Sequence, residues 1–281
     1  MFHRSLTMML ALGAALTATA QTQESQRWSR VSGDNHFSRD NCVKVRDGKG
    51  AEYAVFQRDV LTKLNKSRVD SGEIAAYIIG RVVAPTGRTA PCDFHIVSSF
   101  DGFPPETSSP EKTAADLKRA GIAMSREAML AKRDELTYLV ATDTWRRRDG
   151  LGRSAKGGYA RLDYYKVKQS STQEWVRAEQ TEWKPVYEAM AKENPGTAWS
   201  INSLALQGGS SLPYNAMTVN GFGDWEAVGK GGQTRTFWNE VHPNTDMTSA
   251  LQKVNAMGEL VRTDLVKFLE VYRKVEVSAT R

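Results

Sequence analysis

Apolar and polar residues follow one order along this chain: an apolar run, an amphipathic stretch and two more apolar runs. The runs are rich in β-branched and aromatic residues, which predicts strands. They are Phe37–Arg46, Ala75–Ala84 and Phe94–Phe100. After the first run, apolar residues from Tyr53 to Leu64 recur every three or four positions, which places them on one helix face. A second helix is expected from Pro110, and the residues from about Leu139 to Arg148 must supply a fourth strand.

This order occurs twice. Shifting the sequence by 122 positions places Val43–Phe103 on Tyr165–Trp225 without a gap, and nine positions are then identical. The identical pairs are Lys44/Lys166, Val45/Val167, Glu52/Glu174, Ala76/Ala198, Ile79/Ile201, Gly87/Gly209, Pro91/Pro213, Val97/Val219 and Phe100/Phe222. The same succession of strand, helix, strand, turn and strand recurs at the same spacing, so the sequence predicts a tandem duplication.

The first helix of the second copy contains a proline. The expected strands of this copy are Tyr159–Lys168, Ala198–Leu206 and Tyr214–Phe222. Its helix at Glu174–Lys192 includes Pro185, which removes a backbone hydrogen bond in a helix interior. We therefore expect this helix to bend near Trp183, whereas the first copy, with Lys63 in the matching place, has a straight helix.

Each copy follows the order β-α-β-β-α-β, the ferredoxin-like arrangement of a four-stranded antiparallel sheet with helices on one face. In the second copy the last helix is expected at Leu251–Tyr272 and the last strand at Val271–Val277. Both faces of the strands are apolar, so the face without helices needs a cover, which the other copy can provide. We predict an α+β fold in which the two repeats pair into a barrel within one monomeric chain. The expected boundaries are 37–148 for repeat 1, 149–158 for a glycine-rich linker and 159–281 for repeat 2.

The residues of the second copy resemble a known superfamily. The relevant segments are Tyr-Lys-Val-Lys (165–168), Trp-Lys-Pro (183–185), Leu-Pro-Tyr (212–214) and Gly-Phe-Gly-Asp-Trp (221–225). Their pattern is similar to that of dimeric α+β barrel proteins, which include NIPSNAP-like and antibiotic-biosynthesis-monooxygenase-like domains. The resemblance covers both copies, 37–148 and 159–277, and implies that a pairing partner is fused into this chain. It includes no catalytic signature, so it assigns no active-site residue.

The first twenty residues have the layout of a secretory signal peptide. Arg4, the apolar run Leu6–Leu16 and the sequence Ala18-Thr19-Ala20 predict cleavage after Ala20. Residues 21–36 are polar and are expected to form a flexible lead-in. No later stretch has the roughly 20 apolar residues that a membrane span needs. We expect a periplasmic or secreted protein, without stable membrane insertion and without nucleic acid as a partner; its formal net charge of +6 is only a mild excess.

Cys42 and Cys92 would meet an oxidising compartment, which favours a disulfide. Their predicted places oppose it. Cys42 falls in the first strand and Cys92 at the start of an antiparallel neighbour, so an offset beyond the ~7 Å Cα separation that a disulfide tolerates is expected. Their partners in the second copy are Tyr164 and Tyr214, which suits two small buried apolar residues. A disulfide is therefore an open alternative and is not the favoured prediction.

Recognisable chemical motifs are sparse. The common hydrolase, nucleotide-binding and zinc-protease motifs are absent, and His36, His95 and His242 have no ligand-spaced partners. No metal and no cofactor is therefore expected. His95 is the one weak candidate for a catalytic base. It lies in mid-strand and matches Met217 of the second copy, so a packed, hydrogen-bonded histidine is the more ordinary interpretation.

Aromatic residues are the most suggestive feature for ligand binding. Tyr77 and Trp199 occupy the same place in the two copies, and large rings with a polar group can line a pocket. The candidate ligand-binding residues are Tyr77, His95, Trp199 and Asn202. If Tyr77, His95 and Asn202 converge on one cavity, an enzyme is favoured.

Three function classes remain open, because this kind of fold hosts unrelated functions. The leading hypothesis is an exported module that binds a small apolar or aromatic molecule between its sheets. One alternative is a cofactor-free monooxygenase-like or isomerase-like enzyme, and another is a structural or interaction protein of the cell envelope. The sequence alone leaves open whether the chain is an enzyme.

Overall fold

The computed structural model describes residues 36–87, 90–106, 108–206 and 213–273. The predicted signal peptide at 1–20, and the lead-in at 21–36 except for His36, lie outside these residues and stay predictions. Within the described ranges, no helix has the length and apolar character needed to cross a membrane.

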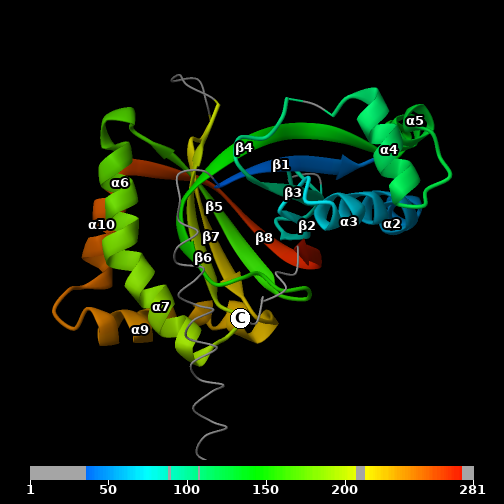
Figure 1. Cartoon of the computed structure of the whole chain (residues 1–281). Coiled ribbons are helices and arrows are strands. Elements are labelled where there is room, and N and C mark those ends of the chain that lie inside the picture. Colours follow the sequence, from blue (N-terminus) through cyan, green and yellow to red (C-terminus); the bar gives the residue numbers. More distant parts are fainter. Residues whose placement is uncertain (1–35, 88–89, 107, 207–212, 274–281) are drawn as a thin grey trace, which may run out of the picture.

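Eight antiparallel strands close into one barrel in the order β1-β3-β2-β8-β5-β7-β6-β4 (Figure 1). Their bounds are β1 His36–Val45, β2 Ala76–Ala84, β3 Phe94–Asp101, β4 Thr137–Leu151, β5 Tyr159–Val167, β6 Ala198–Leu204, β7 Ala216–Phe222 and β8 Gly258–Arg273. The fourth strand of each repeat joins the two halves. β4 pairs with β1 and also with β6 of repeat 2, while β8 pairs with β5 and also with β2 of repeat 1. The prediction of two ferredoxin-like repeats that pair within one chain is confirmed.

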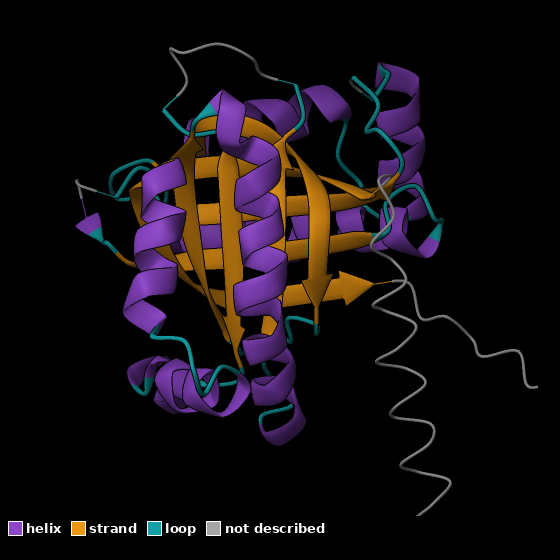
Figure 2. Cartoon of the chain, turned by 90° about the vertical axis from the view of Figure 1, so that its left-hand side faces the viewer, coloured by secondary structure: helices purple, strands orange, loops and turns teal. Residues whose placement is uncertain are grey.

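Helices cover the outside of the barrel in two groups, one over each repeat (Figure 2). Over repeat 1 lie α2 Gly50–Phe56, the π-helical η1 Gln57–Leu61, α3 Thr62–Asp70, α4 Pro110–Arg119 and α5 Arg126–Leu136. Repeat 2 has η3 Gln169–Ser171, α6 Thr172–Ala178, the π-helical η4 Glu179–Trp183, α7 Lys184–Glu193, α8 Trp225–Gly229, η5 Gly231–Gln233, α9 Thr234–Val241 and α10 Met247–Met257. Ser109 caps α4 by accepting the backbone N–H of Lys112, so this helix begins where the sequence predicts.

The last strand corrects the prediction of a long helix at Leu251–Tyr272. α10 ends at Met257, and the residues that follow form β8. Backbone pairing along both edges of β8 outweighs the helical spacing of its apolar residues, because both faces of this strand are partly buried. Repeat 1 shows the same effect, since β4 begins at Thr137 and continues to Leu151. The first three residues of the predicted linker 149–158 are therefore strand.

Strand alternation gives the molecule an inner core and separate outer cores. Along β5, Leu162 and Tyr164 point into the barrel, where they pack with Trp145 and Met217 from other strands. Tyr165 faces the other way and packs against the helices of repeat 2. The barrel interior is thus the interface between the two repeats, and each helical layer buries a core of its own.

A disulfide joins Cys42 to Cys92 inside the barrel, with the two Cα atoms 5.2 Å apart. The expectation of an offset too large for a disulfide was wrong. The ladder between β1 and β3 ends at the pair Val43 and Phe94, and the backbone N–H of Asp93 also donates to the Val43 carbonyl. The chain therefore turns just before β3, and this turn places Cys92 beside Cys42 instead of further along the strand.

Candidate active site

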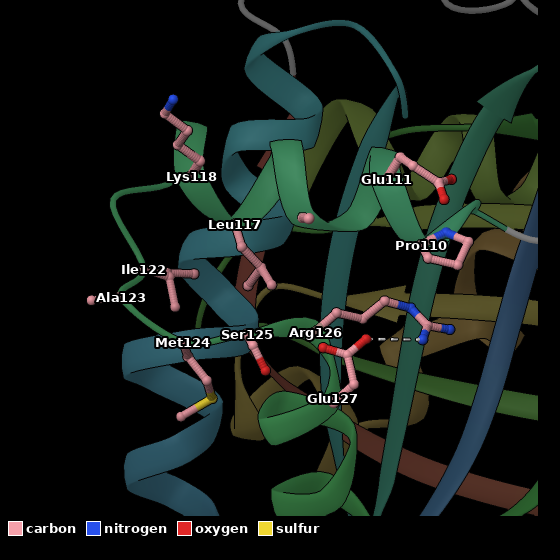
Figure 3. Close-up of a pocket in the computed structure, with 11 residues that line it drawn as sticks. Pro110, Glu111, Leu117, Lys118, Ile122, Ala123, Met124, Ser125, Arg126 and Glu127 are labelled. Carbon is pink, nitrogen blue, oxygen red and sulfur yellow. Dashed lines mark ion pairs between the residues drawn. The ribbon is translucent and has the colours of Figure 1, made fainter.

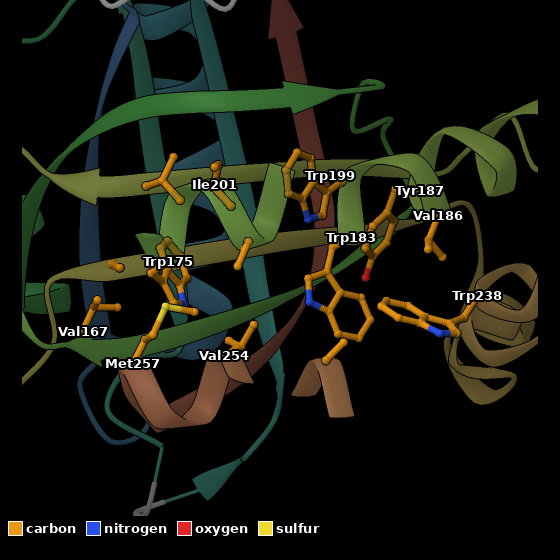
Figure 4. Packing of buried hydrophobic residues seen from close by; sticks show 14 of the residues in the cluster. Val167, Trp175, Trp183, Val186, Tyr187, Trp199, Ile201, Trp238, Val254 and Met257 are labelled. Carbon is orange, nitrogen blue, oxygen red and sulfur yellow. The ribbon is translucent and has the colours of Figure 1, made fainter. Parts of the chain in front are cut away.

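A cavity of about 710 Å³ lies between the outer face of the sheet in repeat 2 and the helices that cover it. Its aromatic lining residues are Tyr165, Trp183, Tyr187 and Trp199. The polar residues on the sheet side and on η4 are Arg161, Asp163, Glu179, Thr218 and Asn220. Tyr187 of α7 and Trp199 of β6 stack with ring centroids 6.1 Å apart, which joins the helix to the sheet at this wall (Figure 4).

The polar wall follows from strand alternation. Arg161, Asp163 and Tyr165 occupy alternate positions of β5 and face the helices, whereas Leu162 and Tyr164 face the barrel interior. On the neighbouring strand β7, Thr218 and Asn220 face the helices in the same way. The sequence thus places polar side chains on a face that elsewhere buries apolar ones.

Glu179 is the residue with the most unusual environment in this cavity. Its side chain is buried, with the residue only 4% exposed, and no hydrogen bond or ion pair links its carboxyl group to another described residue. Burial disfavours the charged form, and the nearby negative charge of Asp163 adds to this effect. Together they raise the pKa of Glu179 to about 8. A carboxyl group on a cavity wall with a pKa near neutrality can both take and return a proton.

Asp163, in contrast, has a complete set of partners. Its carboxylate accepts hydrogen bonds from Arg161 Nε at 2.8 Å, Asn220 Nδ2 at 3.0 Å and Thr263 Oγ1 at 2.7 Å. Three donors from β5, β7 and β8 hold this side chain in one orientation. Asp163 therefore provides a fixed negative charge beside Glu179, and of these two carboxyl groups only that of Glu179 has no partner among the described residues.

A widened helical turn positions Glu179. It is the first residue of η4, where the backbone N–H of Lys184 donates to the carbonyl of Glu179, five residues back. π-helical turns of this kind are frequent at functional sites. Pro185 follows within the first turn of α7, where a missing N–H is tolerated.

Repeat 1 has the same widened turn. The backbone N–H of Thr62 donates to the carbonyl of Gln57 in η1, at positions that match Lys184 and Glu179. The predicted contrast between an interrupted helix in repeat 2 and a straight one in repeat 1 was therefore wrong. Both copies have the interruption, so Pro185 fits it and does not cause it.

A second hollow, of about 550 Å³, lies between α4 and α5 of repeat 1 (Figure 3). Of its four ionisable residues, Glu111, Lys118 and Glu127 are exposed and Arg126 is half-buried. Backbone N–H groups at the starts of the two helices lower the pKa of Glu111 and of Glu127, as is ordinary for acidic residues in a first helical turn. None of the described residues that line this hollow is a buried ionisable group, so the cavity of repeat 2 is the better candidate site.

His95 lies inside the barrel, away from the cavity. Its Nδ1 is 2.9 Å from Asp40 Oδ2, and its Nε2 is 3.1 Å from Asp264 Oδ2. Burial alone would lower the pKa of His95, but the two carboxylates overcome that effect and raise it to about 9. The imidazole is therefore mostly protonated at neutral pH, which leaves no lone pair for a base. The prediction of His95 as a catalytic base therefore has no support from this geometry.

The other candidate residues are divided between three places. Trp199 lines the cavity of repeat 2, and Tyr77 is buried against the helices of repeat 1, where Gln57 donates to its hydroxyl at 3.0 Å. Asn202 points into the barrel and donates to Ser200 Oγ at 3.1 Å. The structure does not bring Tyr77, His95 and Asn202 to one cavity. Their roles in ligand binding stay predictions, and only Trp199 lies at the site described here.

Sequence reasoning missed Glu179, although the sequence contains a signal for it. Glu179 lies four residues after Trp175 and four before Trp183, so it falls on the aromatic face of its helix. An acidic residue on a face that is otherwise buried needs a physical explanation. The repeat alignment adds a second signal, since the first copy has the uncharged Gln57 in this place.

No protein-family model and no curated protein matches the chain. Solved structures do match. One, named a "putative monooxygenase" from Fusobacterium nucleatum, has 10% sequence identity and a TM-score of 0.57, with 85% of this chain and 95% of that chain covered. Another of the same name, from Lactobacillus acidophilus, has 8% identity and a TM-score of 0.53, with 85% and 96% covered. The chain thus has the ferredoxin-like α+β barrel fold of these monooxygenase-like structures, formed by two repeats of one chain.

Proposed function

We propose that the protein binds a small aromatic molecule in the cavity of repeat 2 and catalyses a proton transfer on it, with Glu179 as the general acid–base group. One observation carries the proposal. Glu179 is a buried carboxyl group without a hydrogen-bond partner among the described residues, and it lies on the wall of a cavity of about 710 Å³. Ligand pockets commonly have volumes of roughly 300–1,000 Å³, and shifted pKa values concentrate at catalytic sites.

Proton transfer suits the chemistry of this wall. A pKa of about 8 lets Glu179 be reprotonated readily near neutral pH, and about one group in ten is ionised at pH 7. The ionised form removes a proton from a phenolic hydroxyl or an activated C–H group. Arg161 also lines the cavity, and its guanidinium group stabilises the negative charge that develops on the substrate.

The aromatic residues of the cavity determine the class of substrate. Tyr165, Trp183, Tyr187 and Trp199 provide flat apolar surfaces for a ring system, while polar groups lie on the sheet side. This keeps the hypothesis of an aromatic ligand but changes its place. The ligand lies between sheet and helices, outside the barrel, and not between the two sheets.

A monooxygenase-like reaction is the finer form of this proposal, and the names of the two similar structures support it. Loss of a proton to Glu179 leaves an electron-rich carbanion that reacts with dioxygen. A methylene group between aromatic rings then becomes a carbonyl, with one oxygen atom in the product and the other released as water. All four electrons come from the substrate, and Glu179 only moves protons.

Anthrone, which has such a methylene group, is a suitable probe. We expect the mature chain to speed hydrogen–deuterium exchange at this methylene, measured by mass spectrometry under anaerobic conditions, and to consume oxygen in air. Glu179→Gln keeps the size of the side chain and removes its acid. It should lower the exchange rate by about 10²–10⁴-fold. Binding, followed by quenching of tryptophan fluorescence, should stay within a few-fold.

Glu174→Gln is the matched control, because Glu174 lies on the same helical stretch and is exposed. It should leave exchange, oxygen uptake and binding unchanged. Equal exchange rates for the wild type and Glu179→Gln would refute the role of Glu179. Binding without exchange in the wild type would reduce the protein to a binding module, and absence of binding would overturn the proposal as a whole.

We further propose that the protein acts as an exported monomer. The Cys42–Cys92 disulfide supports export, because disulfides persist in oxidising compartments. Closure of the barrel within one chain supports the monomer. Native mass spectrometry of periplasmic protein tests both proposals, and the expected species is a single chain that lacks residues 1–20. A homodimer, or a chain that keeps these residues, would contradict the corresponding proposal.

A further inference from the structure

The barrel interior holds a second chemical cluster, separate from the cavity of repeat 2. Cys92, His95 and Asp264 place a sulfur, a nitrogen and an oxygen atom within 4.8 Å of one another. The three residues are 0%, 2% and 0% exposed. They come from the turn before β3, from β3 itself and from β8, so strands of both repeats build the cluster.

We propose that reduction of the Cys42–Cys92 disulfide turns Cys92, His95 and Asp264 into a binding site for a divalent cation of the zinc type. Zinc is bound in proteins by thiolate, imidazole and carboxylate groups, at about 2.0–2.3 Å from each. Three such ligands leave a fourth position, which Cys42 or a water molecule can fill. The proposal is independent of the function proposed for Glu179.

The partners of His95 prepare it for this role. Asp40 accepts a hydrogen bond from Nδ1, which directs Nε2 toward Asp264. Metal-binding histidines commonly donate their other ring N–H to a carboxylate in this way, which fixes the tautomer and the ring orientation. Asp40 therefore positions His95 without touching the cation.

Asp264 has one oxygen atom free for a cation. Its Oδ2 lies 2.7 Å from the guanidinium group of Arg262 and also contacts His95. Its Oδ1 is buried and has no hydrogen-bond partner among the described residues. An unpartnered buried carboxylate oxygen is costly, and a bound cation removes that cost. The negative charges of Asp40 and Asp264 attract a cation to this site, whereas the positive charge of Arg262 repels it.

The disulfide determines when the site can form. In the oxidised chain the sulfur of Cys92 is bonded to Cys42 and cannot act as a thiolate ligand. A dithiol reductant supplies two electrons and two protons. The S–S bond breaks, two thiols form, and the reductant becomes its cyclic disulfide. The cation then replaces the proton on the Cys92 thiol and the proton on His95 Nε2, and both protons pass to solvent.

The matching positions of repeat 2 cannot form such a site. Tyr164, Tyr214 and Met217 stand where repeat 1 has Cys42, Cys92 and His95. Tyr164 and Tyr214 pack with ring centroids 4.9 Å apart, so the two positions are in contact in both repeats. Only repeat 1 combines this contact with groups that bind metals.

Two single substitutions separate the metal site from a purely structural disulfide. Cys42→Ser and Cys92→Ser both abolish the disulfide and both leave one free thiol, but only Cys42→Ser keeps the sulfur that faces His95 and Asp264. We expect Cys42→Ser to bind about one cobalt(II) per chain without reductant, with the absorption bands of a thiolate–cobalt complex. Cys92→Ser should bind none, and neither should the oxidised wild type. Asp40→Asn, added to Cys42→Ser, should weaken binding about 10–100-fold.

Circular dichroism of both variants shows whether they fold. If they do not, the wild type made in a reducing cytoplasm and kept in a phosphine reductant gives the same test. Added zinc should then raise Tm for the reduced chain and not for the oxidised one. Equal cobalt binding by the two serine variants, cobalt binding by neither folded variant, or a Tm that zinc does not change in the reduced chain would overturn the proposal.

Discussion

The helix-facing sides of the two repeats share one backbone plan and differ in their chemistry. Gln57 and Glu179 are the first residues of matching π-helical turns. Gln57 accepts a hydrogen bond from the hydroxyl of Tyr53 at 2.8 Å and donates to the hydroxyl of Tyr77 at 3.0 Å. Its amide is thus held within a closed buried network, whereas Glu179 has no hydrogen-bond partner among the residues that the structure describes and lines a cavity.

The neighbours explain the difference. Trp175 and Trp199 of repeat 2 stand where repeat 1 has Tyr53 and Tyr77, so indole rings replace the two hydroxyl groups that satisfy Gln57. Trp175 Nε1 is itself buried without a hydrogen-bond partner among the described residues. Three differences at matching positions therefore separate a hydrogen-bonded amide in repeat 1 from a buried carboxyl group in repeat 2 that has no partner among the described residues. The comparison teaches that two halves with the same backbone plan can differ in whether the side chain at one matching position is fully hydrogen-bonded or left without a partner at a cavity.

The largest effect on stability is expected in the barrel interior, where His95 of repeat 1 and Met217 of repeat 2 occupy matching positions. His95→Ala should lower the free energy of unfolding by about 3–5 kcal/mol, because it leaves Asp40 and Asp264 buried without the protonated imidazole between them. Urea denaturation measures this loss. Met217→Ala should cost about 2 kcal/mol or more through lost packing alone.

A second substitution distinguishes the loss of charge pairing from the loss of packing. Asp264→Asn added to His95→Ala removes one unpaired charge and should restore part of the lost stability, although Arg262 then loses its partner on Asp264. The same change added to Met217→Ala should give no gain. If Asp264→Asn rescues neither variant, His95 acts by packing, as a methionine does.

The sequence predicted the fold well because the evidence for it was long-range and repeated. Strands such as Ala76–Ala84 and Phe94–Asp101 combine β-branched residues with clear turns, and the predicted duplication indicated that each sheet needs a partner. The errors came from places where tertiary pairing decides. β8 has apolar residues at helical spacing, yet its two neighbouring strands fix it as a strand. A turn of a few residues before Phe94 likewise decided the geometry of the disulfide.

The candidate site was harder to predict. Tyr77 and Trp199 match in the repeat, but their surroundings differ, and only one of them lines a cavity. The sequence shows His95 as a candidate because it is a histidine in a strand. It does not show the contact between His95 and Asp264, which lies 169 residues away in sequence. The sequence signal for Glu179 is a difference between the copies, because an acid replaces the neutral amide of Gln57 on a buried helix face. The signal for the fold, in contrast, is the set of identical positions.

Ionisation of Glu179 should make the stability of the protein depend on pH. The pKa of Glu179 is about 8 in the folded chain against an ordinary value of 4.5, so the folded state holds a proton that the unfolded state has lost in this range. The free energy of unfolding should therefore fall as pH rises from about 4.5 to about 8. Glu179→Gln removes this contribution. Relative to the wild type, the variant should gain about 3 kcal/mol between about pH 5 and pH 8, measured by urea denaturation.

The reciprocal substitution tests whether burial at this position is enough to raise the pKa of a carboxyl group in repeat 1 as well. Gln57→Glu places an acid among Tyr53, Thr62 and Tyr77, and it should give the wild type a second loss of stability in the same pH range. Glu174→Gln, on the surface, should leave the pH profile unchanged. A parallel shift of the Glu179→Gln and wild-type curves, without a change of slope, would show that Glu179 ionises normally.

The smallest effect is expected where the two repeats are most alike, at the turn after each π-helical segment. Lys63 of repeat 1 matches Pro185 of repeat 2, and the residues before them have similar backbone angles, with φ and ψ of −66° and −44° at Thr62 and −52° and −47° at Lys184. Lys63→Pro should therefore cost only about 1 kcal/mol, below the roughly 3 kcal/mol of a proline in a helix interior. Lys66→Pro, one turn later in α3, should cost that full amount. Equal losses in urea denaturation would show that the widened turn of repeat 1 cannot accept what repeat 2 accepts, and that the backbone plan of the two repeats diverges at this point as well.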